Sequence, residues 1–294
     1  MRRCLYQGLC KNTATPQILC MRGGVLDRLP RTAYDRPSFL VTLPENIGMT
    51  ALVIDRLTKN FGGLQALHDL SLEIQPGERR VILGPNGAGK TTLFHLIGGQ
   101  LSPSSGRLFL YGQEVTHLPP FRRAALGLAR TFQLTTLFPN LTVLENMLLA
   151  VQALDAVRFV LYRPLTSYHY VLSKAQSLLE QWDLWEKRQA LVRQLSYGEQ
   201  RQLEILLALA HTPKVLLLDE PTAGLSAAET QQVVAMLQHL APCITVLLIE
   251  HDMAVAFQVA QHITVLHQGR LLADGSPLAI RQDPTVAEIY LGVQ

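Results

Sequence analysis

The sequence predicts an α/β fold, in which strands and helices alternate from Met49 onward. The short runs at 215–218 and 244–249 are rich in leucine or in β-branched residues, which is typical of parallel strands buried on both faces. A glycine-rich turn joins one strand to the helix that follows it, and two acids stand at the carboxyl end of another strand. These observations predict a parallel sheet covered by helices, with functional residues at the carboxyl ends of its strands.

The individual elements are expected in chain order. Strands are expected at 51–56, 70–74, 79–83, 107–110, 215–219, 244–249, 263–266 and 270–274, and a helix at 90–98. The segment 133–194 is mainly helical in pattern, with amphipathic helices expected at 146–157 and 170–182 and Pro164 between them. We therefore expect a helical subdomain, about 134–200, inserted into a domain that spans 49–294. The sequence has no internal repeat of useful length, so a single such domain is expected.

The composition excludes several classes of protein. The 294 residues are 48% hydrophobic and 17% charged, which fits a globular protein with a sizeable core. The sequence has no run of roughly 18 uncharged apolar residues and so predicts no transmembrane helix. The net charge is +3, and residues 1–48 alone carry +4, which leaves −1 on the remainder. The folded part therefore lacks the basic excess that would indicate a nucleic-acid partner.

Residues 1–48 differ from the rest of the chain. They hold seven Lys or Arg, three acids and four prolines without a clear period, and no apolar stretch of the length that a signal peptide needs. We expect this segment to be disordered, or to lie outside the natural reading frame with Met49 as the true start. A targeting or docking arm is the alternative. An intact mass of the native protein that includes residues 1–48 would contradict the shorter start.

Cysteine usage indicates a reducing compartment. Three of the four cysteines, Cys4, Cys10 and Cys20, lie in the first twenty residues at spacings that fit no standard zinc site. Cys243 stands alone beside an expected strand, and we expect it to be a small core residue.

The glycine-rich turn carries a phosphate-binding motif. Residues 84–91 match the pattern G-x-x-x-x-G-K-[ST] without a mismatch, between an expected strand and an expected helix. The glycines let the backbone N–H groups point at phosphate oxygens, Lys90 adds a positive charge at the β- and γ-phosphates, and Thr91 can offer its hydroxyl to Mg²⁺. A glycine-rich turn that binds nothing is the alternative. The predicted ATP-binding residues of this turn are Gly84, Pro85, Asn86, Gly87, Ala88, Gly89, Lys90, Thr91 and Thr92.

Two acids close the aliphatic strand at 215–219. A buried parallel strand delivers its last residues to the edge of the sheet where ligands bind. Asp219 is placed there to hold Mg²⁺ through water, and Glu220 is the candidate general base that activates the attacking water. An Asp-Glu pair that merely begins a loop is the alternative for an isolated motif. In a chain with a phosphate-binding motif, the pair predicts nucleotide hydrolysis.

A third motif, L-S-Y-G-E-Q-R, precedes the acidic strand at 195–201. It resembles the L-S-G-G-Q signature, and with the two motifs above it makes residues 50–294 resemble the nucleotide-binding domain of an ABC transporter. The resemblance implies a P-loop NTPase fold, an ABC-type nucleotide-binding domain with an inserted helical subdomain and an N-terminal antiparallel β region. It also implies that the signature contacts ATP held by a second subunit, through Leu195, Ser196, Tyr197, Gly198, Glu199 and Gln200.

The same family template gives roles to three further residues. Phe61 resembles the aromatic residue that stacks on adenine, with a core phenylalanine as the alternative. Gln133, in R-T-F-Q, resembles the glutamine that senses Mg²⁺ and contacts the membrane partner, and His251 resembles the switch histidine at the γ-phosphate. The resemblance thus implies catalytic roles for Glu220, His251 and Lys90, ATP contacts by Phe61 and Gln133, and Mg²⁺ ligation by Thr91, Gln133 and Asp219.

Departures from the common ABC sequence pattern indicate which subgroup of the family the chain resembles. Tyr197 replaces the first signature glycine, Glu199 replaces its glutamine, and Ser226 replaces an aspartate in the loop A-G-L-S, which weakens the role usually given to that loop position. With R-T-F-Q at 130–133 and I-E-H-D-M at 249–253, these departures make the chain similar to the branched-chain amino-acid importer ATPases of the LivG type. Leu207 stands where that pattern often has arginine. The urea-importer and lipopolysaccharide-export ATPases are close relatives and remain alternatives.

The resemblance implies an ATPase, with ATP and Mg²⁺ as cofactors, that is coupled to transport. Its implied partners are a second nucleotide-binding subunit, identical or different, transmembrane permease subunits and, indirectly, a periplasmic binding protein, with no nucleic acid. Its implied location is peripheral, at the cytoplasmic face of the plasma membrane. A soluble ABC ATPase of cofactor assembly is an alternative. A non-hydrolysing regulatory subunit is another, against which the complete set of Lys90, Asp219, Glu220 and His251 argues.

Overall fold

The computed structural model describes residues 50–131, 137–153 and 169–291. All of them lie within one compact unit of the chain, Ile47–Gln294. The expectations for residues 1–48, for Gln133 and for the middle of the segment 133–194 fall wholly or partly outside the described residues.

An antiparallel sheet forms the N-terminal part of the described chain. Its strands are β1 (Leu52–Phe61), β2 (Leu64–Ile74), β4 (Ser105–Leu110) and β5 (Gln113–Glu114), in the order β2-β1-β4-β5. This confirms the expected antiparallel β region. The first two strands are longer than the predicted 51–56 and 70–74, because they continue as a hairpin to a turn at Gly62 and Gly63. Pairing between the two strands of the hairpin stabilises this polar, partly exposed stretch. Its sequence lacks the apolar pattern of a buried strand, so it was not predicted.

A second sheet carries the parallel strands. Within the described residues it holds β3 (Arg79–Leu83), β6 (Leu128–Arg130), β7 (Val215–Asp219), β8 (Thr245–Ile249), β9 (His262–His267) and β10 (Arg270–Gly275), in the order β10-β9-β3-β8-β7-β6. All neighbours are parallel except β9 and β10. The carboxyl ends of β3, β8 and β7 therefore meet at one edge of the sheet, as predicted. The edge strand β6 was not predicted, since three residues are too few to show a period.

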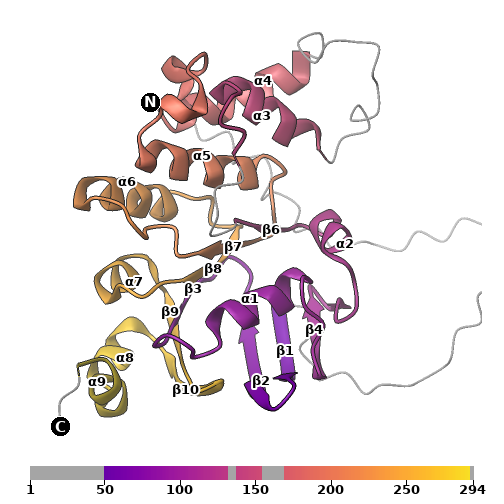
Figure 1. The fold of residues 1–294 in the computed structure, drawn as a ribbon, viewed down its shortest axis with the longest axis vertical. Coiled ribbons are helices and arrows are strands. Elements are labelled where there is room, and N and C mark those ends of the chain that lie inside the picture. Colours follow the sequence, from indigo (N-terminus) through magenta and orange to yellow (C-terminus); the bar gives the residue numbers. More distant parts are fainter. Residues whose placement is uncertain (1–49, 132–136, 154–168, 292–294) are drawn as a thin grey trace, which may run out of the picture. The chain divides into compact units, whose positions relative to one another are not determined.

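Helices cover the parallel sheet and extend away from it. They are α1 (Lys90–Gly98), α2 (Pro120–Ala125), α3 (Val143–Gln152), α4 (His169–Gln181), α5 (Tyr197–Leu209), α6 (Ala227–Gln238), α7 (Met253–Val259), α8 (Pro277–Gln282) and α9 (Pro284–Leu291). Short 3₁₀ turns lie at Trp185–Lys187 and Val192–Gln194. Figure 1 shows α3 and α4 side by side next to α5, and α3 packs against both.

The helix expected at 146–157 begins earlier and ends earlier than predicted. Thr142 caps it: the Thr142 hydroxyl accepts from the Glu145 N–H, and the Glu145 carboxylate accepts from the Thr142 N–H at 2.7 Å. This reciprocal capping fixes the start of α3 at Val143. The helix predicted at 170–182 is α4, displaced by one residue at each end.

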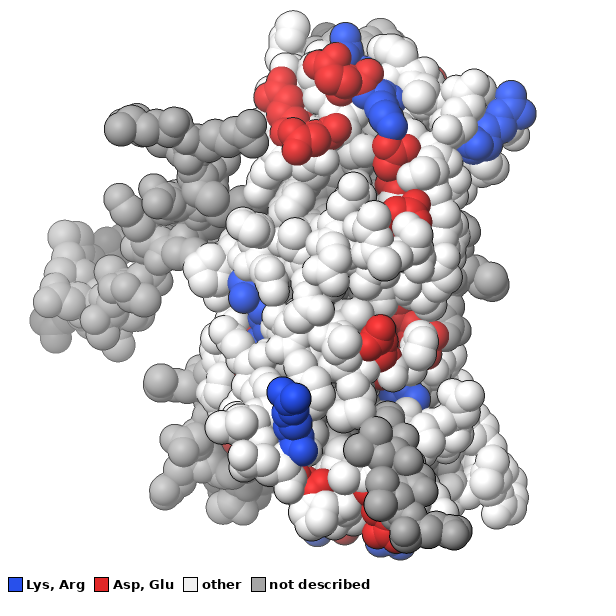
Figure 2. Space-filling model, turned by 90° about the vertical axis from the view of Figure 1, so that its left-hand side faces the viewer, with Lys and Arg blue, Asp and Glu red and all other residues white. Residues whose placement is uncertain are grey.

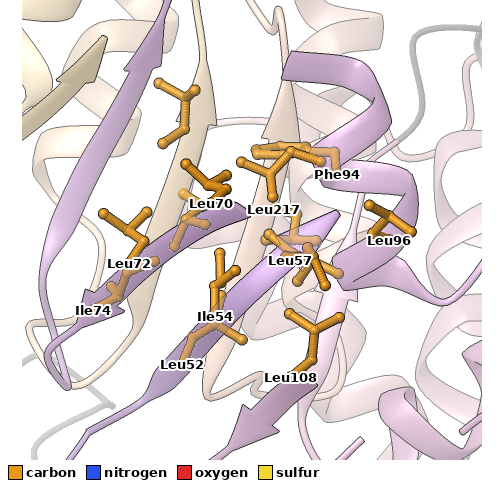
Figure 3. Close-up of a cluster of buried hydrophobic side chains, with 14 of the residues drawn as sticks. Leu52, Ile54, Leu57, Leu70, Leu72, Ile74, Phe94, Leu96, Leu108 and Leu217 are labelled. Carbon is orange, nitrogen blue, oxygen red and sulfur yellow. The ribbon is translucent and has the colours of Figure 1, made fainter. Parts of the chain in front are cut away.

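The main core lies between the two sheets and is built around α1. Figure 3 shows aliphatic side chains of β1, β2 and β4 meeting Phe94 and Leu96 of α1 and Leu217 of β7. Phe94, Leu96 and Leu217 are fully buried. Because α1 follows the glycine-rich turn directly, this packing holds the turn in a fixed place relative to both sheets.

Cys243 is exposed, so the expectation of a core cysteine was wrong. It lies in the turn that precedes β8, one residue before the chain becomes buried at Ile244. Among the described residues, no helix is both long enough and apolar enough to span a bilayer. On the face in Figure 2, acidic and basic side chains are interspersed among uncharged ones.

Candidate active site

The edge formed by β3, β7 and β8 brings the main sequence motifs together. The glycine-rich turn follows Leu83 of β3, the acidic pair ends β7, and Glu250 and His251 follow β8. The register pairs Asp219 of β7 with Ile249 of β8, and Ile249 with Ile82 of β3. Segments more than 160 residues apart in the chain are therefore aligned at one edge by the sheet alone.

The side chain of Lys90 is bound to the backbone of the glycine-rich turn. Lys90 lies at its end, with 7% of its surface exposed, and its Nζ donates to the carbonyls of Gly84 at 2.6 Å and Pro85 at 3.1 Å. Burial lowers the pKa of Lys90, and the charges of Glu220 and Asp219 oppose this shift. The ammonium is thus directed into the turn, where a phosphate group would be its natural counter-ion.

Gly89 has a conformation and surroundings that other residues would not tolerate. Its φ is +98°, and a Cβ there would stand 2.7 Å from the carbonyl oxygen of Ala66. It precedes α1 and offers no side-chain cap, so the first N–H groups of α1 are not used by a capping side chain. A helix start of this kind favours an anion.

A cleft of about 830 Å³ opens beside this turn. The structure brings two of the expected residues from elsewhere in the chain to its wall, Phe61 and Glu220. Phe61 is 45% exposed, which contradicts the alternative of a core phenylalanine. Asn86, Gly87, Ala88, Gly89, Lys90, Thr91 and Thr92 line the same cleft.

Sequence reasoning missed several residues of this cleft. His68, Gln268 and Arg270 also line it. His68 belongs to β2, Gln268 to the turn between β9 and β10, and Arg270 to the start of β10. The turn is joined to the glycine-rich turn by the bond from the Gly269 N–H to the Ala88 carbonyl, 3.1 Å. No spacing pattern in the sequence marks them, because a fold-dependent contact brings them to the site.

The acidic pair has two different environments. Asp219 is 1% exposed, and its Oδ2 accepts from the Arg130 guanidinium at 3.1 Å, while its Oδ1 is buried and meets no hydrogen-bond partner among the described residues. Burial raises the pKa of Asp219, and Arg130 opposes the rise. Glu220 is partly exposed and has a φ of +47°, which is uncommon for a residue with a side chain. This backbone turn follows β7 directly.

The two residues that follow β8 differ in burial: Glu250 is buried and His251 is exposed. Glu250 is fully buried, and its carboxylate accepts from the Thr222 hydroxyl at 2.7 Å. Burial raises the pKa of Glu250. Glu250 thereby ties the end of β8 to the loop that follows Glu220, a role that the sequence did not indicate. His251 is exposed at the same edge of the sheet, next to Glu250.

The signature begins α5, as expected for Ser196 and Gly198. Ser196 is the N-cap: its hydroxyl accepts from the Glu199 N–H at 3.3 Å, and the Glu199 carboxylate accepts from the Ser196 N–H. Glu199 also pairs with Lys187. The departure from glutamine at Glu199 therefore completes a capping box. Tyr197 is 45% exposed. Leu195 is buried, and the Gln200 side chain donates to its carbonyl.

Gly198 contacts a carboxylate that the sequence did not place here. The Gly198 N–H donates to Glu229 Oε1 at 3.0 Å, and a Cβ on Gly198 would lie 2.6 Å from Glu229 Cγ. Glu229 Oε2 caps α6 through the N–H and hydroxyl of Ser226. These bonds from Ser226, and the bond from Gly198, hold the pKa of Glu229 below its ordinary value. Ser226, the departure in the A-G-L-S loop, is thus linked to the signature.

The donors in the cleft suit a magnesium ion held mainly by nucleotide. Among the described residues, no group of three His, Cys, Asp or Glu side chains could hold a metal without other ligands. Mg²⁺ is commonly bound by one or two protein oxygens together with substrate phosphates. The buried, unbonded Oδ1 of Asp219 and the hydroxyl of Thr91 at the cleft fit this mode.

Comparisons with known families agree with this arrangement. The family model described as ABC transporter matches residues 67–223, and the model described as branched-chain amino acid ATP-binding cassette transporter matches residues 270–294. The high-affinity branched-chain amino acid transport ATP-binding proteins BraF of Pseudomonas aeruginosa and LivG of Escherichia coli are each 38% identical to the chain over 248 residues. Each alignment covers 82% of this chain and 97% of the relative.

Solved structures give the same result for the fold. The ADP conformation of an ATP-binding cassette of an ABC transporter superposes with a TM-score of 0.73 at 31% identity, covering 83% of this chain and 99% of that one. A nucleotide-free cassette gives 0.71 at 30% identity, covering 82% and 99%. A dimeric post-hydrolysis cassette bound to ADP and phosphate gives 0.65 at 27% identity, covering 77% and 98%.

Proposed function

The chain belongs to the ABC transporter family and is an ATP-binding, ATP-hydrolysing subunit of a transporter, and we propose that it powers the import of branched-chain amino acids. The observation that carries the proposed substrate is the match of the C-terminal segment 270–294 to the branched-chain amino acid transporter model. The 38% identity to BraF and LivG over nearly their whole length supports the same substrate.

In the proposed site, each residue has a separate task. Lys90 and the N–H groups of the glycine-rich turn neutralise the phosphates, and Phe61, which lines the same cleft, stacks on the base. Glu220 takes a proton from the attacking water, and His251 contacts the γ-phosphate. Thr91, Gln133 and, through water, Asp219 would hold Mg²⁺, which would neutralise negative charge on the phosphates.

A second nucleotide-binding subunit completes the proposed site. Its signature residues at 195–200 would face the phosphates held by the first subunit, with Ser196 and Gly198 at the helix start. The dimeric cassette that shares this fold supports such an arrangement. Since Gly198 is bonded to Glu229 in the single chain, engagement of the signature is coupled to the Ser226 loop.

The transmembrane partners are proposed to dock near α2. An apolar cavity of about 340 Å³ there is lined by Phe121, Leu128 and Leu207, among others, and Phe121 is 68% exposed. Exposed apolar surface beside a cavity indicates a protein contact. The proposed location is accordingly peripheral, at the cytoplasmic face of the plasma membrane, with a periplasmic binding protein as an indirect partner.

Uptake measurements test the proposed substrate. We expect deletion of the gene to lower uptake of radiolabelled leucine, isoleucine and valine, and the intact gene to restore it. The Glu220→Gln gene, which keeps the protein but removes the proposed base, should not restore it. Unchanged branched-chain uptake with a defect in urea uptake or in lipopolysaccharide export would contradict the proposed substrate and favour one of the related systems.

Replacing Phe61 by alanine should weaken ATP binding without unfolding the chain. Stacking of a base on an aromatic side chain contributes about 1–3 kcal/mol, or roughly 5- to 150-fold in affinity. The ring is exposed, so its loss leaves no cavity in the core. Titration with a fluorescent ATP analogue measures the effect. Phe138→Ala is the matched control, because Phe138 is also exposed but does not line the ATP cleft. Equal affinities for both variants would reject the stacking role.

A further inference from the structure

Arg130 meets Asp219 at the carboxyl edge of the parallel sheet. Arg130 is the last residue of β6, and Asp219 is the last residue of the neighbouring strand β7. Their side chains are 6% and 1% exposed, and the guanidinium contacts one carboxylate oxygen, Oδ2, at 3.1 Å. Two charges are therefore paired in a region from which water is largely excluded.

The guanidinium is held from a second side by α1 and the chain that follows it. Arg130 Nη1 donates to Gln100 Oε1 at 3.0 Å, and the guanidinium carbon lies 5.7 Å from the centre of the Phe94 ring. Phe94 belongs to α1, the helix that begins at Lys90. Arg130 thus connects the glycine-rich turn's helix with the strand that carries the acidic pair. A planar guanidinium can bind the Asp219 carboxylate, the Gln100 amide and the Phe94 ring at the same time, whereas a lysine ammonium presents a single point charge.

The ion pair leaves the other carboxylate oxygen free for a different partner. Asp219 Oδ1 is buried and unbonded within the described part of the chain, although buried oxygens are normally paired. Because the Arg130 guanidinium pairs with Oδ2, one carboxylate oxygen is committed to the ion pair and the other is left without a partner among the described residues.

We infer that Arg130 is a positioning residue for the metal ion of the proposed site, because it orients the Asp219 carboxylate through Oδ2 and leaves Oδ1 to accept from a metal-bound water. The inference rests on the proposed function, since it takes Asp219 as a ligand through water. Residues that orient metal ligands typically contribute 10- to 100-fold to metal affinity when they are removed. Arg130 acts through Asp219 and needs no contact with the nucleotide.

The test separates metal binding from nucleotide binding. Affinity of the full chain for a fluorescent ATP analogue is measured in EDTA and again at saturating Mg²⁺, for the parent and for Arg130→Met. In EDTA we expect the two chains to agree within about twofold, because Lys90 and the glycine-rich turn are intact. With Mg²⁺ we expect Arg130→Met to bind the analogue about tenfold more weakly than the parent.

Two further variants control for folding and for charge. Arg80→Met breaks two other ion pairs at the opposite end of β3, a buried one with Glu78 at 2.6 Å and a partly exposed one with Asp274 at 2.8 Å. It should leave the Mg²⁺-dependent gain in affinity unchanged. Arg130→Lys retains the positive charge and should recover part of the Mg²⁺-dependent increase in affinity that Arg130→Met loses. If Arg130→Met does not fold, the comparison is made with Arg130→Lys.

Two results would overturn the inference. In the first, Mg²⁺ raises the affinity of Arg130→Met for the ATP analogue by the same factor as it raises that of the parent. In the second, Arg130→Met binds the analogue more weakly than the parent by the same factor with and without Mg²⁺, which would indicate a purely structural role. A parent chain whose ATP affinity does not respond to Mg²⁺ would instead contradict the proposed metal role of Asp219, and the inference with it.

Discussion

Replacing Glu220 by glutamine is expected to lower the rate of ATP hydrolysis by about 10²–10⁴-fold, the usual contribution of a positioned general base. Glutamine has nearly the same shape but cannot accept the proton of the attacking water. Glu220 lines the cleft together with Lys90, so binding of the phosphates should persist. ATP should therefore remain bound and hold the proposed pair of nucleotide-binding subunits together.

Two measurements check this result. Phosphate release gives the hydrolysis rate, and equilibrium binding of a fluorescent ATP analogue gives the affinity. Glu145→Gln is the matched control, because Glu145 is also a glutamate with hydrogen bonds of its own but caps α3 instead of lining the cleft. Hydrolysis by Glu220→Gln at the parent rate would remove Glu220 from the role of general base.

Replacing Lys90 by methionine should abolish most of the affinity for ATP. A hydrogen bond to a charged group contributes about 1.5–3 kcal/mol, which corresponds to roughly 10- to 150-fold in affinity. Methionine fills the buried space of the lysine stem, so the change removes the charge and leaves the packing nearly intact. The rate of hydrolysis should fall by about 10²–10³-fold as well, since the transition state loses a phosphate-binding cation.

The same binding and phosphate-release assays measure the Lys90→Met variant. Lys214→Met is the control, because Lys214 lies over the Tyr111 ring and does not line the cleft. Thermal unfolding of both variants verifies that they are folded. An ATP affinity of Lys90→Met equal to that of Lys214→Met would mean that Lys90 does not contact the phosphates.

The sequence predicted the order of the strands in the chain better than their limits. Strand β7, helix α1 and strand β3 match their predicted bounds, because each ends at a motif or a glycine. The hairpin of β1 and β2 was predicted only in part, since its outer half is polar and depends on cross-strand pairing. Cys243 was wrongly placed in the core because it lies in the turn before β8, where the chain is still exposed.

The sequence by itself determined the chemistry of this protein. The motifs at 84–91 and 219–220 are each formed by consecutive residues, since a turn that surrounds phosphate uses successive backbone N–H groups and a strand end delivers its last side chains together. Such motifs can be recognised before the fold is known. The signature at 195–201 is equally local, because it is the start of one helix.

Only the tertiary structure decided which residues support that chemistry. The partner of Asp219 lies 89 residues away and is selected by the parallel pairing of β6 with β7, and the partner of Gly198 lies 31 residues away at the start of another helix. Ion pairs and hydrogen bonds between side chains form when burial brings two groups within about 3 Å, whatever their separation in the chain. Arg130 and Glu229 gain their roles from that proximity, which no spacing in the sequence records.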